Sequence, residues 1–168
     1  MTYTVRPLGD GHDVSGFTCG NASLDEWLKG HARAATRQGT RTHVMVEGEG
    51  GSVVGYFAVA PHLIERDAMP KKLGRGAPRQ IPAILLAKLA IDRRAQGQGL
   101  GSELLVFALE HIVAAARVAG GKVVVVDAID EGAAGFYRRH DFEPLPGNPS
   151  RLVQKLSTVA AALGLDWP

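Results

Sequence analysis

The sequence predicts an α/β protein in which one mixed, partly parallel β-sheet carries helices, all within a single domain spanning residues 1–168. In the second half of the chain, strand-like and helix-like segments alternate, and this order favours parallel neighbouring strands. Residues 123–126 are consecutive valines, a pattern typical of a buried strand. The length of 168 residues suits one hydrophobic core, because two domains would each be marginally small.

A helix is expected in the first quarter of the chain. Ser23 and Glu26 fit the S-x-x-E capping pattern, so the helix should begin near Leu24. It should end near Gly39, because glycine readily adopts the conformation that terminates a helix. Apolar residues recur at a spacing that turns one face toward a core: Leu24, Trp27, Leu28 and Ala35.

Strands are expected on both sides of this helix. Residues 2–7 resemble an opening strand, and residues 41–47 and 52–60 resemble a hairpin joined by the glycine-rich turn 48–51. Residues 61–81 are rich in proline, glycine and basic side chains, so we expect a loop that holds at most one short helix.

The second half alternates strands and helices. Strands are expected at 82–92, 122–127 and 151–157, and helices at 99–119 and 131–140. The longer helix should end at two consecutive glycines. Its apolar residues have helical spacing: Leu100, Leu104, Phe107, Ala108, Ile112 and Ala115.

The composition is that of an ordinary globular protein, with 45% hydrophobic and 21% charged residues. Cys19 is the only cysteine, which excludes an internal disulfide and a cysteine-rich metal site and suits a reducing compartment. No apolar run is long enough to span a bilayer, and the N-terminus does not read as a signal peptide. A cytoplasmic protein without a metal is therefore expected.

Basic residues are concentrated in two stretches. Between Trp27 and Met45 there are four basic residues and no acidic one, and between Met69 and Ala90 there are five, again without an acid. Such stretches can attract a polyanion if the fold brings them to one side, or they can be two solvated faces.

A glycine-rich turn follows the strand-like stretch that ends at Asp92. Gly97, Gly99 and Gly101 leave backbone amides unobstructed at the start of a helix, an arrangement that favours a phosphate. A P-loop is excluded because no lysine follows the glycines, and the dinucleotide fingerprint lacks its third glycine. The pattern that fits is Q-x-x-G-x-G; a tight turn without a ligand is the alternative.

This pattern resembles the Gcn5-related N-acetyltransferase (GNAT) superfamily. Residues 133–142 extend the likeness with an aromatic pair, although Asp141 stands where glycine is common. The resemblance implies a central mixed sheet flanked by helices on both faces and acetyl-coenzyme A bound along one strand and the turn. The residues it assigns to the cofactor are Leu89, Ala90, Ile91, Gln96, Gly97, Gln98, Gly99, Leu100, Gly101 and Phe136.

With that family in view, Tyr137 is the candidate proton donor to the leaving thiolate, because a phenol with a pKa of about 10 is protonated at neutral pH. No histidine is spaced to form a dyad with an acid, so no general base can be named. This favours an α-amine acceptor, with a pKa of about 7.7 to 8.0, over a lysine at about 10.4.

A narrower resemblance covers nearly the whole chain. Residues 17–21 (F-T-C-G-N), 24–28 (L-D-E-W-L), 55–57 (G-Y-F), 81–82 (I-P) and 86–92 (L-A-K-L-A-I-D) are similar to the acetyltransferase toxins of bacterial toxin–antitoxin modules. That likeness implies acetylation of the α-amine of aminoacyl-tRNA, which blocks translation, by a homodimer that is neutralised by a small ribbon-helix-helix antitoxin.

Basic residues fit such a substrate. Lys29, Arg33 and Arg37 are four residues apart, so on one helix they would form a ridge. The residues expected to contact tRNA are Lys29, Arg33, Arg37, Arg41, Arg75 and Arg79.

Two alternative functions remain. One is an acetyltransferase for a small-molecule amine or a protein N-terminus, and the other is a coenzyme A-binding module without catalysis. Cys19 is expected to be a packing residue and not a nucleophile.

Overall fold

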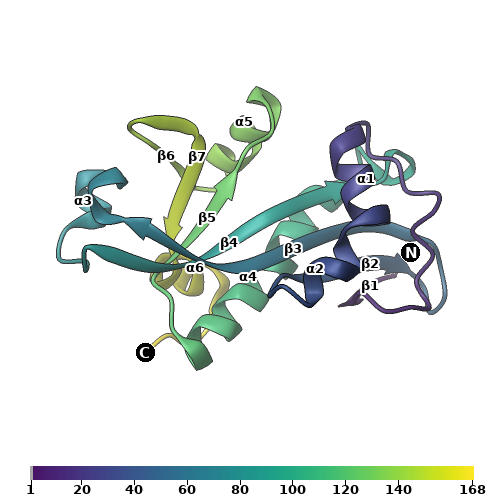
Figure 1. Ribbon diagram of the computed structural model, residues 1–168, viewed down its shortest axis with the longest axis horizontal. Coiled ribbons are helices and arrows are strands. Elements are labelled where there is room, and N and C mark those ends of the chain that lie inside the picture. The colour runs from purple at the N-terminus through teal and green to yellow at the C-terminus, as the bar shows by residue number, and fades with distance from the viewer. Residues whose placement is uncertain (1) are drawn as a thin grey trace. The chain divides into compact units, whose positions relative to one another are not determined.

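The computed structural model describes residues 2–168, whose helices and strands are labelled in Figure 1. In chain order the elements are β1 (Tyr3–Pro7), α1 (Ala22–Gly30), α2 (Ala32–Thr36), β2 (Arg41–Glu47), β3 (Val53–Glu65), η1 (Arg66–Ala68), α3 (Lys71–Gly74), β4 (Gln80–Ile91), η2 (Arg93–Ala95), α4 (Leu100–Ala119), β5 (Val123–Asp127), α5 (Glu131–Arg139), β6 (Glu143–Leu145), β7 (Asn148–Lys155) and α6 (Leu156–Leu163).

The strands are hydrogen-bonded in the order β1-β2-β3-β4-β5-β7-β6. Strands β4 and β5 are parallel, whereas the β1–β2, β2–β3, β5–β7 and β6–β7 pairs are antiparallel. The prediction of a mixed, partly parallel α/β sheet is therefore confirmed. No helix within residues 2–168 has the length and apolar character needed to cross a membrane.

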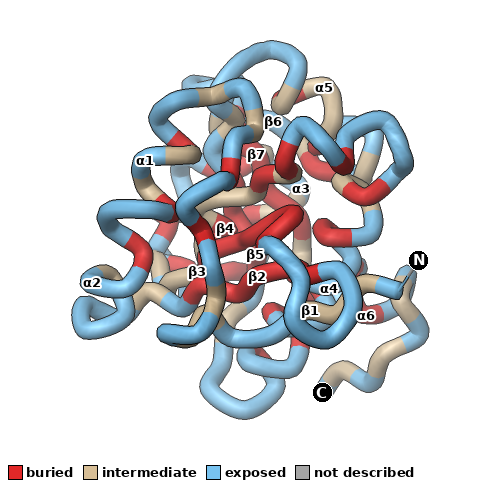
Figure 2. Tube along the Cα trace, turned by 90° about the vertical axis from the view of Figure 1, so that its right-hand side faces the viewer, coloured by how far each residue is buried: buried red, intermediate tan, exposed pale blue. Residues whose placement is uncertain are grey.

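The chain forms two compact units, each built from two separate segments. The first unit contains the chain up to Ala60 together with Ala87–Ala108, and the second contains Pro61–Leu86 and Leu109–Pro168. The chain passes between the units within β4 and α4 and at the Ala60–Pro61 bond of β3. Figure 2 shows buried positions, in red, along strands β2, β4 and β5.

Helices cover both sheet faces of the first unit. On one face, Leu24 and Leu28 of α1 share a buried cluster with Val44 and Tyr56, and the Tyr56 hydroxyl donates to the Leu24 carbonyl at 2.7 Å. On the other face, a Cβ added to Gly55 would lie 3.2 Å from Leu104 Cδ2, so α4 packs directly on the strand there. Alternating side chains of β3 thus contact helices on opposite sides.

The second unit is organised around β5 and β7. Residues 123–126 are all nearly inaccessible, as expected for a strand with a neighbour on each side. One cluster joins Val123, Val125 and Val153 to Met69 and Ile81. Helices α5 and α6 both pack against β7. The predicted strand at 122–127 is confirmed, and its lack of alternation follows from this burial.

The first helix differs from the prediction in its start and its length. Asn21, not Ser23, is the N-cap, because the Asn21 side chain accepts a 3.0 Å hydrogen bond from the Leu24 amide. The helix is also interrupted after Gly30, where His31 leaves the helical region with φ −127°. A glycine in the last turn and a non-helical residue after it split the expected single helix into α1 and α2.

Elsewhere the main differences lie at element ends. Strand β3 continues to Glu65 through a stretch expected to be a loop, and the short strand β6 and helix α6 were not predicted.

Helix α4 buries four of the six residues expected to face the core, but Phe107 is 39% exposed and Ala115 is also exposed. The buried stripe instead includes Leu105, Leu109, Val113 and Ala116.

Candidate cofactor turn and catalytic helix

The glycine-rich turn leaves β4 and leads into the longest helix. After Ile91 the chain makes the short helix η2, and α4 begins at Leu100. Gly97 and Gly99 have φ values of +80° and +76°, which side chains with a Cβ rarely adopt. A Cβ added at either position would meet no atom within 4 Å, so this side of the turn is open.

Backbone amides in the turn are available to a ligand. Within residues 2–168, the N–H groups of residues 97–101 donate to no protein acceptor, as expected at the first turn of a helix. The N-terminus of α4 also carries partial positive charge from its aligned peptide dipoles. Open glycines, free amides and the dipole together fit a diphosphate group, which is the part of acetyl-coenzyme A predicted to lie here.

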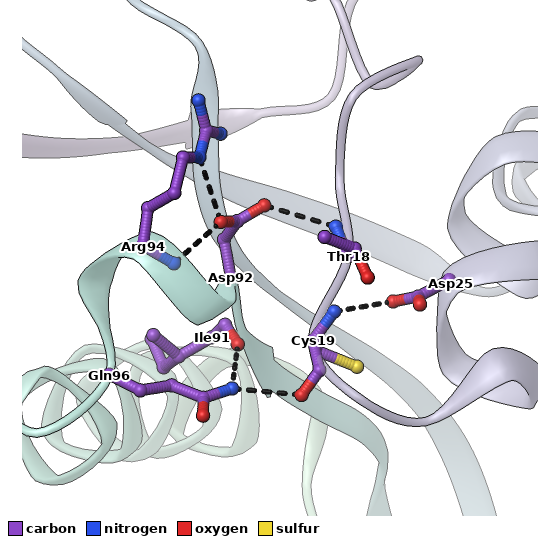
Figure 3. A network of polar contacts seen from close by, with 7 residues as sticks. All are labelled: Thr18, Cys19, Asp25, Ile91, Asp92, Arg94 and Gln96. Atoms are coloured by element: carbon purple, nitrogen blue, oxygen red, sulfur yellow. Dashed lines mark hydrogen bonds and ion pairs between the residues drawn. The ribbon is translucent and has the colours of Figure 1, made fainter.

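Asp92 anchors the start of the turn through its side chain (Figure 3). Its side chain is fully buried, and one carboxylate oxygen accepts a 3.0 Å hydrogen bond from the Thr18 amide. The other oxygen accepts 2.9 Å hydrogen bonds from the backbone and the guanidinium of Arg94. Burial alone would raise the pKa of Asp92, but these hydrogen bonds outweigh it and hold that pKa below its ordinary value. The residue is therefore an ionised structural anchor.

Gln96 ties the same two segments together a second time. Its side-chain nitrogen donates at 2.8 Å to the Ile91 carbonyl, at the end of β4, and at 2.8 Å to the Cys19 carbonyl, before α1. Both amide hydrogens are thus used within the protein. The glutamine of the Q-x-x-G-x-G pattern consequently holds the turn in shape through its nitrogen.

Cys19 belongs to this anchor and not to the reacting groups. Its amide donates to Asp25 at 2.8 Å, and its thiol lies 3.6 Å from the Asn21 carbonyl. Burial, with help from Asp25, raises the pKa of Cys19 to about 11. The thiol is therefore protonated at neutral pH and a poor nucleophile.

Strand β4 is approached closely by β3 just before the turn. A Cβ on Gly55 would lie 2.9 Å from Ile91 Cδ1 and 3.2 Å from the Ala90 carbonyl. Only glycine fits without movement of these atoms. Gly55 therefore helps to position the part of β4, Leu89 to Ile91, that the family resemblance assigns to acetyl-coenzyme A.

Helix α5 carries the predicted catalytic tyrosine in the second unit. Asp130 caps its start by accepting a 2.8 Å hydrogen bond from the Ala133 amide. Tyr137 is 6% exposed and packs edge-on against Phe136 and Phe142. Burial raises the pKa of Tyr137 well above 10.0, so the phenol remains protonated at physiological pH.

The aspartate in place of the usual glycine after α5 adopts the glycine conformation. Asp141 has φ +70°, and it is the only residue other than glycine with positive φ in the described chain. The Phe142 amide donates to the Tyr137 carbonyl at 3.1 Å, and the Asp141 amide donates to Arg138 at 3.1 Å. The turn that ends α5 is therefore formed despite the substitution, at a cost in backbone strain.

Arg151 lies between His62 and Asp127 and contacts both. Arg151 makes two hydrogen bonds of 2.7 and 2.8 Å to Asp127, and its Nη1 lies 3.0 Å from His62 Nε2. Burial and the adjacent guanidinium lower the pKa of His62. His62 is therefore neutral at neutral pH, with Nε2 directed at Arg151.

The predicted basic ridge is divided between two helices. Lys29 lies on α1, Arg33 lies on α2, and Arg37 follows α2, so the expectation of one helix carrying all three was wrong. Arg33 donates to the carbonyls of Gly9 and His12 at 3.1 Å.

The other arginines predicted to contact tRNA differ in their hydrogen bonds within the protein and in their exposure. Arg41 donates to the carbonyls of Thr36 and Thr40. Arg37, Arg75 and Arg79 are exposed.

Comparison with known proteins assigns the family. Residues 38–144 match the acetyltransferase (GNAT) domain. Over 159 residues, covering 95% of both chains, the protein is 36% identical to the tRNA-acetylating toxin of Mycobacterium tuberculosis (strain ATCC 25618 / H37Rv).

Solved structures agree with this match. AtaT complexed with acetyl-methionyl-tRNAfMet superposes with a TM-score of 0.88 at 29% identity, covering 96% of this chain and 99% of that one. A tyrosine-to-phenylalanine mutant of AtaT, bound to acetyl-CoA and the C-terminus of the antitoxin AtaR, has a TM-score of 0.82 at 28% identity over 96% and 98% of the two chains. The predicted fold, enzyme class and acetyl donor are confirmed: the chain belongs to the GNAT family of acetyltransferases.

Proposed function

We propose that this acetyltransferase modifies the α-amine of the amino acid on charged tRNA and thereby acts as the toxin of a toxin–antitoxin module. The observation that carries the proposal is the open turn at residues 97–101, whose free amides suit the cofactor diphosphate, in a chain that is 36% identical over 95% of its length to a tRNA-acetylating toxin.

The cofactor would be held by main-chain groups. The amides of Gly97 to Gly101 would bind the diphosphate, and the strand residues Leu89, Ala90 and Ile91 would line the pantetheine arm together with Phe136. When bound, acetyl-coenzyme A supplies the activated acetyl group. Gln96 and Asp92 keep the amides oriented through their contacts with residues 18 and 19.

Tyr137 would supply the proton that acyl transfer requires. Its Oη has no hydrogen-bond partner within residues 2–168, and burial keeps the hydroxyl protonated by raising its pKa. A buried, protonated phenol can hold a proton ready for a departing thiolate.

The acceptor is proposed to be an α-amine because no histidine in the sequence is spaced to pair with an acid as a general base. His62, the histidine with a lowered pKa, is directed at Arg151. An α-amine has a pKa of about 7.7 to 8.0, so a useful fraction is neutral without a base.

Cationic residues would bind the phosphates of tRNA. Lys29 and Arg37 are exposed, and Arg75 and Arg79 add charge from the second unit. Arg33 and Arg41 donate to carbonyls, yet a guanidinium has five N–H donors and can contact a phosphate as well.

The assembly follows from the same proposal. We propose a homodimer in the cytoplasm, where charged tRNA is found, neutralised by a small ribbon-helix-helix antitoxin; AtaT bound to the C-terminus of AtaR supports an antitoxin partner. We also propose that residues 1–168 work as one acetyltransferase domain, because β3, β4 and α4 each contribute residues to both compact units.

Radiolabelled acetyl-coenzyme A and a mixture of charged tRNAs would test the proposal. We expect label that remains with the amino acid after the ester bond is hydrolysed, and none with uncharged tRNA. Label transferred only to small amines or to peptide N-termini would replace the proposal with the alternative acceptors. The absence of label on every charged tRNA would refute it.

A further inference from the structure

A cavity of about 330 Å³ in the second unit is lined by basic side chains. Arg75, Lys122 and Lys155 contribute the charge, and Ser157 and Trp167 complete the polar and aromatic lining. No acidic residue is among the lining residues, and within residues 2–168 none of the three cations forms an ion pair. Three positive charges without a counter-charge favour binding of an anion.

The strand register brings two of these cations to one end of the β5–β7 pair. Val123 of β5 pairs with Lys155 of β7, and the Leu156 amide donates to the Lys122 carbonyl at 3.0 Å. Lys122 also donates its amide to the Pro82 carbonyl at 2.8 Å. The backbone beneath both lysines is therefore fixed by hydrogen bonds, and both residues line the same cavity.

The start of helix α6 adds a second attraction for an anion. Ser157 is the second residue of this eight-residue helix, and Lys155 is its N-cap residue without a side-chain capping bond. First-turn amides have no acceptor within their own helix and carry the positive end of the helix dipole. Ser157 thus places a hydroxyl and the helix terminus beside the lysines.

Arg75 and Trp167 are held by ordered turns. Arg66 fastens the loop that bears Arg75, because its Nη1 donates to the Ala77 carbonyl at 3.0 Å. Gly164, at φ +69°, ends α6, and the Leu165 amide donates back to Ala160 at 2.8 Å. This reversal leads the chain into Trp167, an aromatic residue that lines the cavity.

We propose that this cavity is a binding site for a nucleoside phosphate, with the phosphate among Arg75, Lys122 and Lys155 and the base against Trp167. The volume, equal to that of about ten liquid water molecules, exceeds what a phosphate alone would fill. An aromatic ring beside a cationic cluster suits a ligand that combines a flat base with an anion. The ligand is either a free nucleotide or one nucleotide unit of an RNA chain.

The site differs from the cofactor turn. Ile81, which lines the cavity, is the second residue of β4, whereas the glycine turn follows the last residue of that strand. Neither Gly97 nor any other residue of the turn is among those that line the cavity. Binding of a free nucleotide here does not depend on the proposed tRNA substrate, whereas binding of an RNA nucleotide rests on that proposed function, which also assigns Arg75 to tRNA.

Fluorescence of Trp167 would report binding. The protein has two tryptophans, so Trp27→Phe leaves Trp167 as the only one. We expect saturable quenching by the four ribonucleoside 5′-monophosphates. The parent nucleosides should bind about tenfold more weakly, because they lack the charge-assisted contacts. Calorimetry on the unaltered chain gives the same comparison if Trp27→Phe does not fold.

Matched lysine variants distinguish binding at the cavity from a non-specific effect of the protein's positive charge. Lys122→Gln and Lys155→Gln should each weaken nucleotide binding several-fold, whereas Lys72→Gln, which removes a cation paired with Glu143 at 3.3 Å outside the cavity lining, should not. Equal weakening by all three variants would overturn the proposal.

Two further binding measurements identify the source of the ligand. Binding of free nucleotides alone assigns the site to a small molecule, and preferential binding of a short single-stranded RNA assigns it to a nucleotide unit of RNA. Both results support the proposal. Absence of saturation with every nucleotide and RNA, or quenching by a glutamate-rich peptide in their place, would overturn it.

Discussion

The buried carboxylate of Asp92 accepts a 3.0 Å hydrogen bond from the backbone amide of Thr18, a residue 74 positions earlier in the chain. Asp92 lies directly after β4, and Thr18 lies in the loop before α1. The hydrogen bond therefore connects the start of the cofactor turn to the segment that leads into the first helix. The geometry of the turn depends on a contact that is distant in sequence.

Replacing Asp92 with asparagine should destabilise the protein. Asparagine keeps one acceptor oxygen but presents an N–H₂ group to donors, so at least one of three hydrogen bonds to a buried carboxylate is lost. We expect the free energy of unfolding to fall by about 2 kcal/mol, measured by urea denaturation at pH 7.

The pH dependence of this loss has a defined sign. The folded pKa of Asp92 lies below the ordinary 3.8, so its contribution is complete above about pH 4 and disappears as the pH falls through the folded pKa. The wild type and Asp92→Asn should therefore converge in stability below pH 4. The exposed control Asp67→Asn should match the stability of the wild type at pH 7. A stability difference between the wild type and Asp92→Asn that persists into acid would contradict the ionised state of Asp92.

Replacing Gln96 with glutamate should weaken cofactor binding. The glutamate would direct oxygens at the carbonyls of Ile91 and Cys19, where the amide nitrogen now donates at 2.8 Å to each. Repulsion would shift the turn, and we expect the KM for acetyl-coenzyme A to rise about tenfold with a smaller change in kcat. Gln38→Glu, at an exposed position, controls for the added charge; an unchanged KM in Gln96→Glu would remove the positioning role.

Local sequence patterns predicted the glycine-rich turn but not the long-range contacts that hold it in place. Glycines and the helix after them could be identified because their conformational demands are local. The contacts of Asp92 and Gln96 with Thr18 and Cys19 could not, because a residue pattern does not reveal which distant loop lies against a strand end.

The first helix demonstrates a second limit. Ser23 and Asn21 both have capping side chains, and only the geometry of the preceding loop decides between them. Likewise, the break at His31 follows Gly30, and a single glycine weakens a helix without by itself marking its end. The basic ridge was inferred from four-residue spacing on one unbroken helix. Because the helix is broken at His31, the prediction that one helix carries the ridge was wrong.

Replacing Asp141 with glycine should stabilise the protein. Asp141 has φ +70°, a conformation that costs a residue with a Cβ about 1 kcal/mol and costs glycine little. We expect the free energy of unfolding to rise by about 0.5 to 1 kcal/mol, and Asp141→Ala to lower it, as measured by denaturation. Equal stability of the glycine and alanine variants would show that this backbone conformation is not strained.

Alanine substitutions at Arg33 and Arg37 should have different effects, one on stability and the other on tRNA binding. Arg33 donates to two carbonyls of the loop before α1, so Arg33→Ala should lower stability by about 1 kcal/mol. Arg37 is exposed and forms no ion pair within residues 2–168, so Arg37→Ala should leave stability unchanged. It should instead weaken charged-tRNA binding and reduce the salt dependence by about one phosphate contact. Unaltered tRNA affinity in Arg37→Ala would exclude it from the interface.

Replacing Tyr137 with phenylalanine should abolish most activity without loss of stability. The Tyr137 hydroxyl has no partner within residues 2–168, so its removal should change the free energy of unfolding by less than about 0.5 kcal/mol. If the phenol supplies the proton, kcat should fall at least about 10²-fold.

The matched control is Tyr56→Phe. Its hydroxyl donates to the Leu24 carbonyl at 2.7 Å, so this variant should lose about 1 to 2 kcal/mol of stability. Because Tyr56 is assigned no part in the reaction, kcat at a temperature where the variant is folded should change little. Burial raises the pKa of Tyr137 above 10.0, so its ionisation should not reduce activity below pH 10. A kcat for Tyr137→Phe as high as that of the control would remove Tyr137 from catalysis.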